Sequence, residues 1–139
     1  MPRKDKYHDE VRTALENDGW TITHDPYYFK VGGKEIYIDL GAERLLAAEK
    51  GEEKVAVEVK SFPRISFLTD FYEAIGKFVI YEDALKIQEP DRMLFLAIPD
   101  HIYFEEMEKE ELVQLVVSNR NVHFFVFNTE NQSIVKWIK

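Results

Sequence analysis

The chain has 139 residues, the length of one domain, and no cysteine, which excludes disulfides, thiolate metal sites and cysteine nucleophiles. Its 18 basic and 26 acidic residues give a net charge of −8, which excludes a strongly cationic protein that coats nucleic acid. No apolar run has the length of a membrane span or the placement of a signal peptide, so we expect a cytoplasmic protein with no membrane partner.

The first predicted element is a helix over residues 4–18, because apolar residues recur there at helical spacing and Gly19 follows. Three short strand-like segments come next, with turn residues between them. They are 20–23, 27–31 and 35–40.

Residues 44–50 have a helix-forming composition of Ala, Leu, Glu and Lys. However, the turn at 50–53 leads directly into the alternating segment 54–60, and a hairpin is the shortest connection. We therefore predict that 44–50 is a strand paired with 54–60.

The clearest predicted helix covers residues 66–88. Its expected apolar side consists of Leu68, Phe71, Tyr72, Ile75, Phe78 and Val79. Residues 93–98 predict a strand buried on both faces, and 100–118 predict a helix whose acidic run 105–111 is a solvated face. A closing hairpin is expected from 122–127 and 134–138. This order predicts a single α/β domain over 1–139, with helices flanking a central mixed β-sheet.

The segment from Val55 to Lys60 carries the strongest chemical signal. In a strand, side chains alternate between faces, so Ala56, Glu58 and Lys60 share one face. Asp39 ends the preceding apolar strand, and two carboxylates on neighbouring strands form a hard oxygen site for Mg²⁺. A lysine beside that ion can orient a water molecule. An exposed edge strand with cross-strand charges is the alternative interpretation.

This arrangement resembles the D…(D/E)xK motif of the PD-(D/E)xK nucleases, whose core has the order αβββαβ. The resemblance implies a restriction-endonuclease-like fold, with Asp39, Glu58 and Lys60 as catalytic residues. It also implies that Asp39 and Glu58 hold Mg²⁺ or Mn²⁺. Ile38 stands where many members carry proline, which leaves the metal-binding Asp39 unaffected.

Two helices add secondary candidates. Lys77 and Tyr81 lie on a polar stripe with Asp70 and Glu73, which we place roughly opposite the apolar side of the helix. They resemble a Gln-x-x-x-Tyr motif of many such nucleases, with lysine replacing glutamine, and this implies contacts to phosphate or DNA. A solvated face is the alternative interpretation.

On the first helix, His8 and Glu10 flank the apolar stripe. Related nucleases often place a glutamate there as an extra metal ligand, which makes Glu10 a secondary candidate, and His8 is a second one. A structural role for His8 and a capping or surface role for Glu10 are the alternatives.

Four runs of the sequence resemble the cyanobacterial XisH family, described as fdxN-element excision controlling factors. These runs are Asp18–Pro26, Asp39–Gly51, Val57–Phe62 and Glu89–Arg92. The likeness extends over effectively the whole chain. It implies an endonuclease-like fold, an XisI-like protein partner and DNA as a partner. It also implies a part in controlling DNA excision by a site-specific recombinase during heterocyst development.

Three functions therefore compete. The first is a Mg²⁺-dependent nuclease that acts on DNA, and the second is a non-catalytic regulatory factor that works through a partner protein. The third is the nuclease toxin of a toxin–antitoxin pair.

The net negative charge favours the regulatory factor, because phosphate neutralisation supplies much of the affinity for DNA. The intact Asp39, Glu58 and Lys60 set favours a nuclease, because burying charges without function is costly. Homodimer formation is left open.

Overall fold

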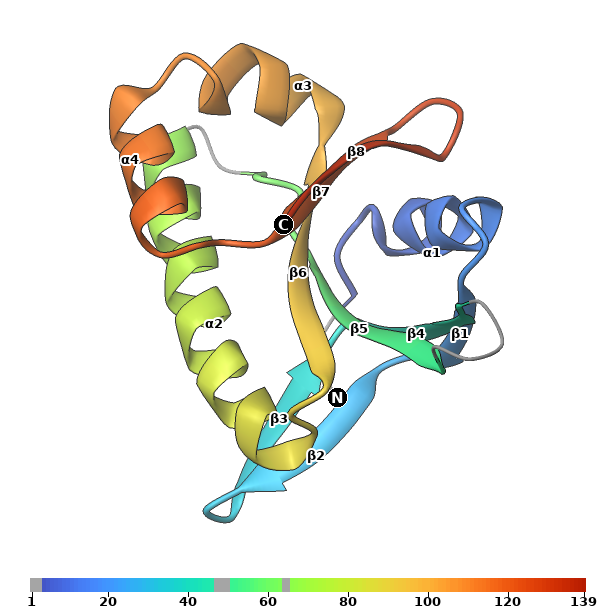
Figure 1. The fold of residues 1–139 in the computed structure, drawn as a ribbon. Coiled ribbons are helices and arrows are strands. Elements are labelled where there is room, and N and C mark those ends of the chain that lie inside the picture. The colour runs from blue at the N-terminus through green and yellow to red at the C-terminus, as the bar shows by residue number, and fades with distance from the viewer. Residues whose placement is uncertain (1–3, 47–50, 64–65) are drawn as a thin grey trace.

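The computed structural model describes residues 4–46, 51–63 and 66–139, and its centre is a six-stranded mixed sheet in the order β1-β4-β5-β6-β7-β8. The strands are β1 (Thr21–His24), β4 (Leu40–Leu45), β5 (Glu52–Val59), β6 (Arg92–Pro99), β7 (Phe124–Asn128) and β8 (Ser133–Ile138). Helix α1 (His8–Asn17) covers one face of the sheet, and α2 (Phe67–Gln88) and α4 (Glu111–Asn119) cover the other (Figure 1). The predicted α/β fold with helices flanking a mixed sheet is confirmed.

The direction of each strand follows from the length of its connection. β4 and β5 are antiparallel, as are β7 and β8, and few residues separate the two strands of each pair. β5, β6 and β7 are parallel, so long crossovers must join them. Helix α2 forms the first crossover, and α3 (Asp100–Ile102), the π-helix η1 (Tyr103–Met107) and α4 form the second.

A separate two-stranded ribbon lies beside the C-terminal half of α2 (Figure 1). It consists of β2 (Tyr27–Val31) and β3 (Lys34–Ile38), which pair antiparallel. One face of the ribbon buries Tyr27, Phe29 and Ile38 in the main core. The strand predicted over 35–40 therefore ends at Ile38, and Asp39 lies at the junction with β4.

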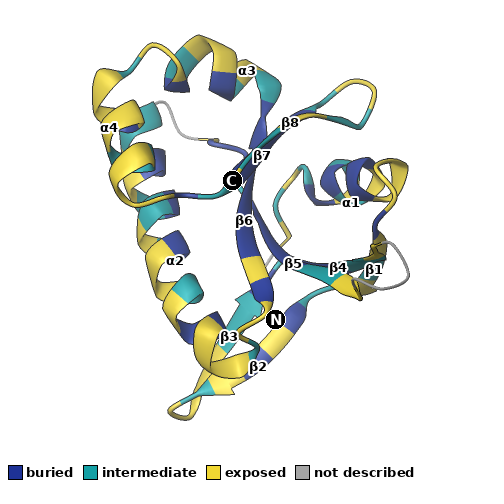
Figure 2. Ribbon diagram, viewed as in Figure 1, coloured by how far each residue is buried: buried dark blue, intermediate teal, exposed yellow. Residues whose placement is uncertain are grey.

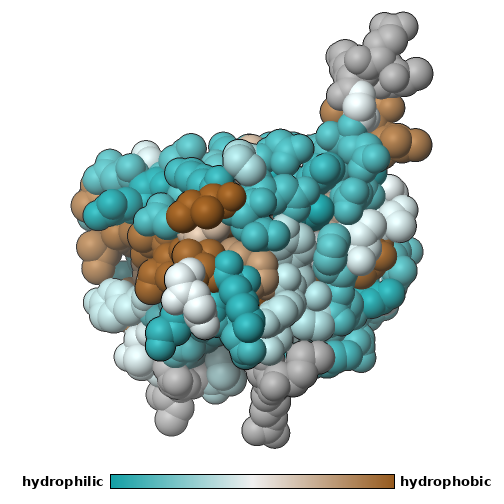
Figure 3. All heavy atoms as spheres, turned by 90° about the horizontal axis from the view of Figure 1, so that it is seen from below, coloured by the Kyte–Doolittle hydropathy of each residue, from teal (hydrophilic) through white to brown (hydrophobic). Residues whose placement is uncertain are grey.

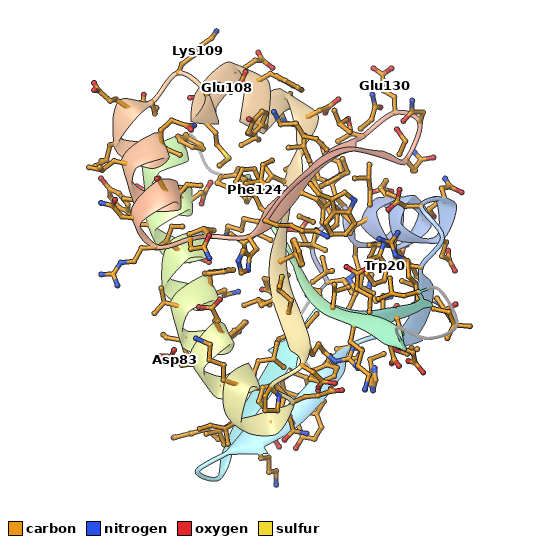
Figure 4. All side chains as sticks on the ribbon, viewed as in Figure 1. Trp20, Asp83, Glu108, Lys109, Phe124 and Glu130 are labelled. Carbon is orange, nitrogen blue, oxygen red and sulfur yellow. The ribbon has the colours of Figure 1, made fainter. Side chains whose placement is uncertain are left out.

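Two hydrophobic cores lie on opposite faces of the sheet. The alternation in β5 divides its residues between them: Val55 and Val57 pack with α1, whereas Ala56 packs with α2. Phe124 belongs to the α2 core and Trp20 to the α1 core, and Figure 4 shows them on the two sides of the sheet. Burial is accordingly concentrated in the sheet and on the inner sides of the helices (Figure 2).

Helix α2 buries a slightly different side from the one predicted. Phe71 and Phe78 are buried as expected, but Tyr72 is 59% exposed and Val79 is 36% exposed. Asp70 is fully buried, so the predicted polar stripe does not lie opposite the core. Each residue turns the helix by about 100°, and apolar residues on adjacent rows leave the buried row ambiguous in sequence.

The hairpin between β4 and β5 is confirmed, but its strand begins earlier than predicted. Leu40 pairs with Val57, and Arg44 and Leu45 pair with Glu53 and Glu52. Thus the segment 54–57 pairs with 40–43 and not with 44–50. Residues 47–50 of the predicted strand lie outside the described residues.

The helix predicted over 100–118 is interrupted. Residues 100–107 form α3 and η1, and α4 begins only at Glu111. The break falls in the acidic run, where like charges four residues apart, such as Glu106 and Glu110, disfavour a continuous helix. The closing hairpin is confirmed as β7 and β8.

Arg92 ties several elements together from a nearly inaccessible position. Its guanidinium donates to Glu89 at 2.7 Å, to the Val55 carbonyl at 2.9 Å and to Glu43 at 3.3 Å, and it lies 4.9 Å from the centre of the Tyr27 ring. These contacts join β2, β4, β5 and β6 to the residue that follows α2. None of the helices in the described part of the chain is long and apolar enough to cross a membrane.

Candidate functional site

A polar pocket of about 210 Å³ opens at the C-terminal end of β5. Its walls come from the segment before α1, from β3, from the β3–β4 junction, from the end of β5 and from α2. The lining residues are Asp5, Glu35, Tyr37, Asp39, Glu58, Val59, Lys60, Lys77 and Tyr81.

The two carboxylates of the predicted motif lie together in this pocket. The Val59 backbone N–H donates to Asp39 Oδ2 at 2.8 Å, and the Asp39 backbone N–H donates to Glu58 Oε1 at 3.3 Å. The Asp39 carboxylate is therefore bound to the backbone at the end of β5, and the Glu58 carboxylate is bound to the backbone at the β3–β4 junction. Asp39 is available for this contact because it lies between β3 and β4, where the chain leaves the ribbon and enters the sheet.

Two lysines approach the carboxylates from different directions. Lys77 of α2 donates to Glu58 Oε2 at 3.4 Å, and Lys60 donates to Glu73 Oε1 at 3.2 Å. The Lys60 side chain is 13% exposed and the Glu58 side chain 9%, so both are largely removed from water. Glu73 thus orients the Lys60 ammonium at the rim of the pocket.

Burial perturbs the pKa of both carboxylates. Burial raises the pKa of Glu58 to about 8, and the neighbouring Asp39 charge acts in the same direction. Burial also raises the pKa of Asp39, although its bond from the Val59 N–H opposes the shift. The pair therefore retains a proton near neutral pH when no cation is present.

The donor set suits a hard divalent cation. Mg²⁺ keeps several waters and is bound by one or two carboxylates, and Asp39 and Glu58 provide two on one wall of the pocket. A divalent charge would replace the retained proton and offset the repulsion between the carboxylates. Within the described residues, no group of three or more His, Asp or Glu side chains is placed to hold a metal ion.

The structure brings together five of the predicted site residues and separates two. Asp39, Glu58, Lys60, Lys77 and Tyr81 all line the pocket. His8 and Glu10 do not line it. His8 is buried on α1, where its Nε2 lies 2.7 Å from Asp25 Oδ1, and Arg12 donates to the other oxygen of Asp25 at 2.6 Å. This geometry gives His8 a structural partner, Asp25, which does not line the pocket either.

Sequence reasoning missed three polar or ionisable lining residues. Glu35, Tyr37 and Asp39 are spaced two residues apart. Because side chains in a strand alternate between faces, this spacing could have placed all three on the same face. Asp5 carried no such signal. Its Oδ1 accepts from the Tyr7 N–H at 2.9 Å, and its Oδ2 accepts from the Ser61 N–H at 3.0 Å. Asp5 therefore links the start of α1 to the residues just after β5.

The mixed sheet and its crossover helices define an α/β protein with an endonuclease-like fold. Residues 1–135 match the model of the XisH protein family, and the chain belongs to this family. No curated protein matches it.

Two solved structures are similar over nearly the whole chain. One is an XisH family protein from Nostoc punctiforme PCC 73102, with 37% identity and a TM-score of 0.86 over 97% of this chain and 100% of that one. The other is a fdxN element excision controlling factor protein from Anabaena variabilis, also with 37% identity and a TM-score of 0.86, over 98% of this chain and 100% of that one.

Proposed function

We propose that this XisH-family protein is an accessory factor in DNA rearrangement, of the kind named for its Anabaena variabilis relative, and that it carries a nuclease-like site for Mg²⁺ or Mn²⁺. One observation carries the site proposal: the buried carboxylate of Glu58 and the half-buried carboxylate of Asp39 meet in a pocket that two lysines also line. Buried like charges are costly, and they are typical of functional sites.

The residues divide into three roles. Asp39 and Glu58 hold the cation, which when bound supplies charge stabilisation for a phosphate oxygen. Lys60, held by Glu73, orients a water molecule and donates a hydrogen bond to the phosphate. Lys77 and Tyr81 of α2 lie on the opposite wall, where they contact a neighbouring phosphate of the DNA.

A protein partner belongs to the same proposal. The net charge of −8 weakens binding to DNA, because affinity for duplex DNA depends on phosphate neutralisation. An XisI-like partner would supply the missing affinity. The same observation favours a second candidate, a non-catalytic regulatory factor that acts through its partner protein.

Metal-dependent stabilisation tests the site directly. Mg²⁺ or Mn²⁺ at a hundredfold excess over its dissociation constant should raise the free energy of unfolding by about 2.7 kcal/mol. Asp39→Asn and Glu58→Gln should each abolish this gain, because each removes an anionic oxygen ligand. Asp83→Asn is the matched control, since Asp83 is an exposed acid on the same helix as Lys77. Urea unfolding with and without metal gives the measurement.

Cleavage is tested separately from binding. Plasmid and oligonucleotide DNA would be incubated with the protein and Mn²⁺, alone and with an XisI-like partner. Loss of cleavage in Lys60→Ala with metal stabilisation intact supports the nuclease. Metal stabilisation of the wild type without cleavage in any mixture favours the regulatory factor, and no stabilisation by either metal overturns the site.

A further inference from the structure

The outward face of the β2–β3 ribbon carries a paired set of tyrosines. In the antiparallel register Tyr28 lies opposite Tyr37, and Lys30 lies opposite Glu35. The other face of the ribbon is committed to the core through Tyr27 and its neighbours. Strand alternation therefore directs Tyr28, Lys30, Glu35 and Tyr37 away from the core.

Tyr28 and Tyr37 form one unit, which we call the tyrosine platform. Their ring centres lie 4.9 Å apart with an angle of 40° between the ring planes. Both hydroxyls donate to the carboxylate of Glu35, at 3.4 Å from Tyr28 and 3.2 Å from Tyr37. Glu35 thereby restricts both rings, while Tyr28 is still 45% exposed to solvent.

The tyrosine platform is continuous with the carboxylate pocket. Tyr37 and Glu35 line that pocket together with Asp39, and Tyr81 lines its α2 wall. If a phosphate of a DNA strand lies at Asp39 and Glu58, the adjacent nucleotide of that DNA strand would therefore lie along β3. Lys30 is exposed on the same face of the ribbon and provides a cation for the sugar–phosphate backbone beyond the pocket.

The composition of the chain makes stacking important for binding. Non-specific affinity for DNA rests on phosphate neutralisation, which a net charge of −8 weakens. Stacking of a base on an aromatic ring needs no net charge and accepts any base. Seen from below, the surface is mostly hydrophilic, and hydrophobic residues gather mainly toward one side of it (Figure 3).

We infer that the tyrosine platform stacks on an unpaired base of single-stranded DNA, whose adjacent phosphate enters the Asp39–Glu58 pocket. The inference rests on the proposed function and names its substrate class: DNA with an unpaired segment. In continuous duplex the base faces are covered by their neighbours, so the platform has no face to engage.

Fluorescence anisotropy with a labelled oligonucleotide of roughly ten nucleotides tests this inference. The wild type is titrated with single-stranded DNA, the same sequence as duplex, and single-stranded RNA, each in Mg²⁺ and in EDTA. Single-stranded DNA should bind more tightly than duplex. Tyr28→Ala and Tyr37→Ala should each weaken its binding about tenfold, as expected for the loss of one stacked base.

Three variants assign the effect to stacking. Tyr28→Phe and Tyr37→Phe keep the ring and remove only the bond to Glu35, so they should retain most of the affinity. Tyr72→Ala is the matched control, because Tyr72 is 59% exposed on α2 and does not line the pocket. Circular dichroism melts confirm that each variant is folded.

The outcomes separate this inference from the proposed function. Duplex binding equal to single-stranded binding, tighter binding of RNA than of DNA, or an equal loss in Tyr72→Ala would overturn the inference. If metal still stabilises the wild type in those cases, the proposed site stands without the platform. If tyrosine-dependent binding persists while metal gives no stabilisation, the platform stands and the metal site fails.

Discussion

Two buried charged groups at opposite ends of β5 have very different surroundings. Near the start of β5, Arg92 of the neighbouring strand β6 donates to two glutamates and a backbone carbonyl, and its side chain is 2% exposed. At the end of the strand, Glu58 lies beside a second carboxylate and receives bonds of 3.3 Å and 3.4 Å. Protein groups alone compensate the charge of Arg92, and they do not compensate the charge of Glu58 in the same way.

The pKa shifts record the same contrast. Hydrogen bonds from Arg92 and Tyr27 outweigh the burial of Glu89 and lower its pKa to about 2. Burial and the Asp39 charge raise the pKa of Glu58 to about 8. A compensated ion network holds a fold together, whereas an uncompensated pair is a place where a ligand of opposite charge can bind.

The largest effect should come from breaking the compensated network. Arg92→Ala leaves Glu89 and Glu43 without their main cation and should lower the free energy of unfolding by about 3–5 kcal/mol. Urea unfolding at neutral pH measures this change. Lys86→Ala is the control, because Lys86 is exposed and its pair with Glu82 is 3.9 Å long, so it should change stability by less than about 0.5 kcal/mol. Similar losses in both variants would contradict a special role for Arg92.

A smaller effect of opposite sign is expected in the pocket. The folded-state pKa of Glu58, about 8, lies above the ordinary glutamate value of 4.5, so wild-type stability falls as the pH rises between these values. Glu58→Gln cannot ionise and should lack this fall. In EDTA near pH 8 the variant should be more stable than the wild type by about 2–4 kcal/mol. Urea unfolding near pH 5 and near pH 8 tests this, and an unchanged pH profile in the variant would contradict it.

The smallest effect is expected at Glu89, and it should disappear in acid. The folded-state pKa of Glu89, about 2, lies below the ordinary glutamate value of 4.5, so its contribution to stability is present above pH 4.5 and is lost as the pH falls toward 2. Glu89→Gln should be less stable than the wild type at neutral pH by about 1–2 kcal/mol, because partial exposure screens the charge. The difference should shrink in acid. Thermal melts across this range measure it, and a constant difference would assign the loss to packing.

Local patterns predicted the parts of the site that lie on one segment. The alternation of β5 correctly placed Glu58 and Lys60 on the same side of the strand, and both line the pocket. The same rule, applied to the segment that ends at Asp39, would also have found Glu35 and Tyr37. The helical spacing of apolar residues predicted α2, which carries Lys77 and Tyr81. It did not predict that Asp70 lies on the buried side of this helix.

The sequence by itself determined the α/β class, the two hairpins around β5 and β8, the crossover helix α2 and the carboxylate pair, because each follows from short-range periodicity or motif spacing. Only the tertiary structure decided that Asp5 binds the backbone of Ser61, that Glu73 holds Lys60 and that Arg92 joins three strands. Such contacts join distant segments or depend on how α2 packs on the sheet. No local pattern encodes them, because side-chain partners across a core are chosen by packing and charge after the elements have assembled.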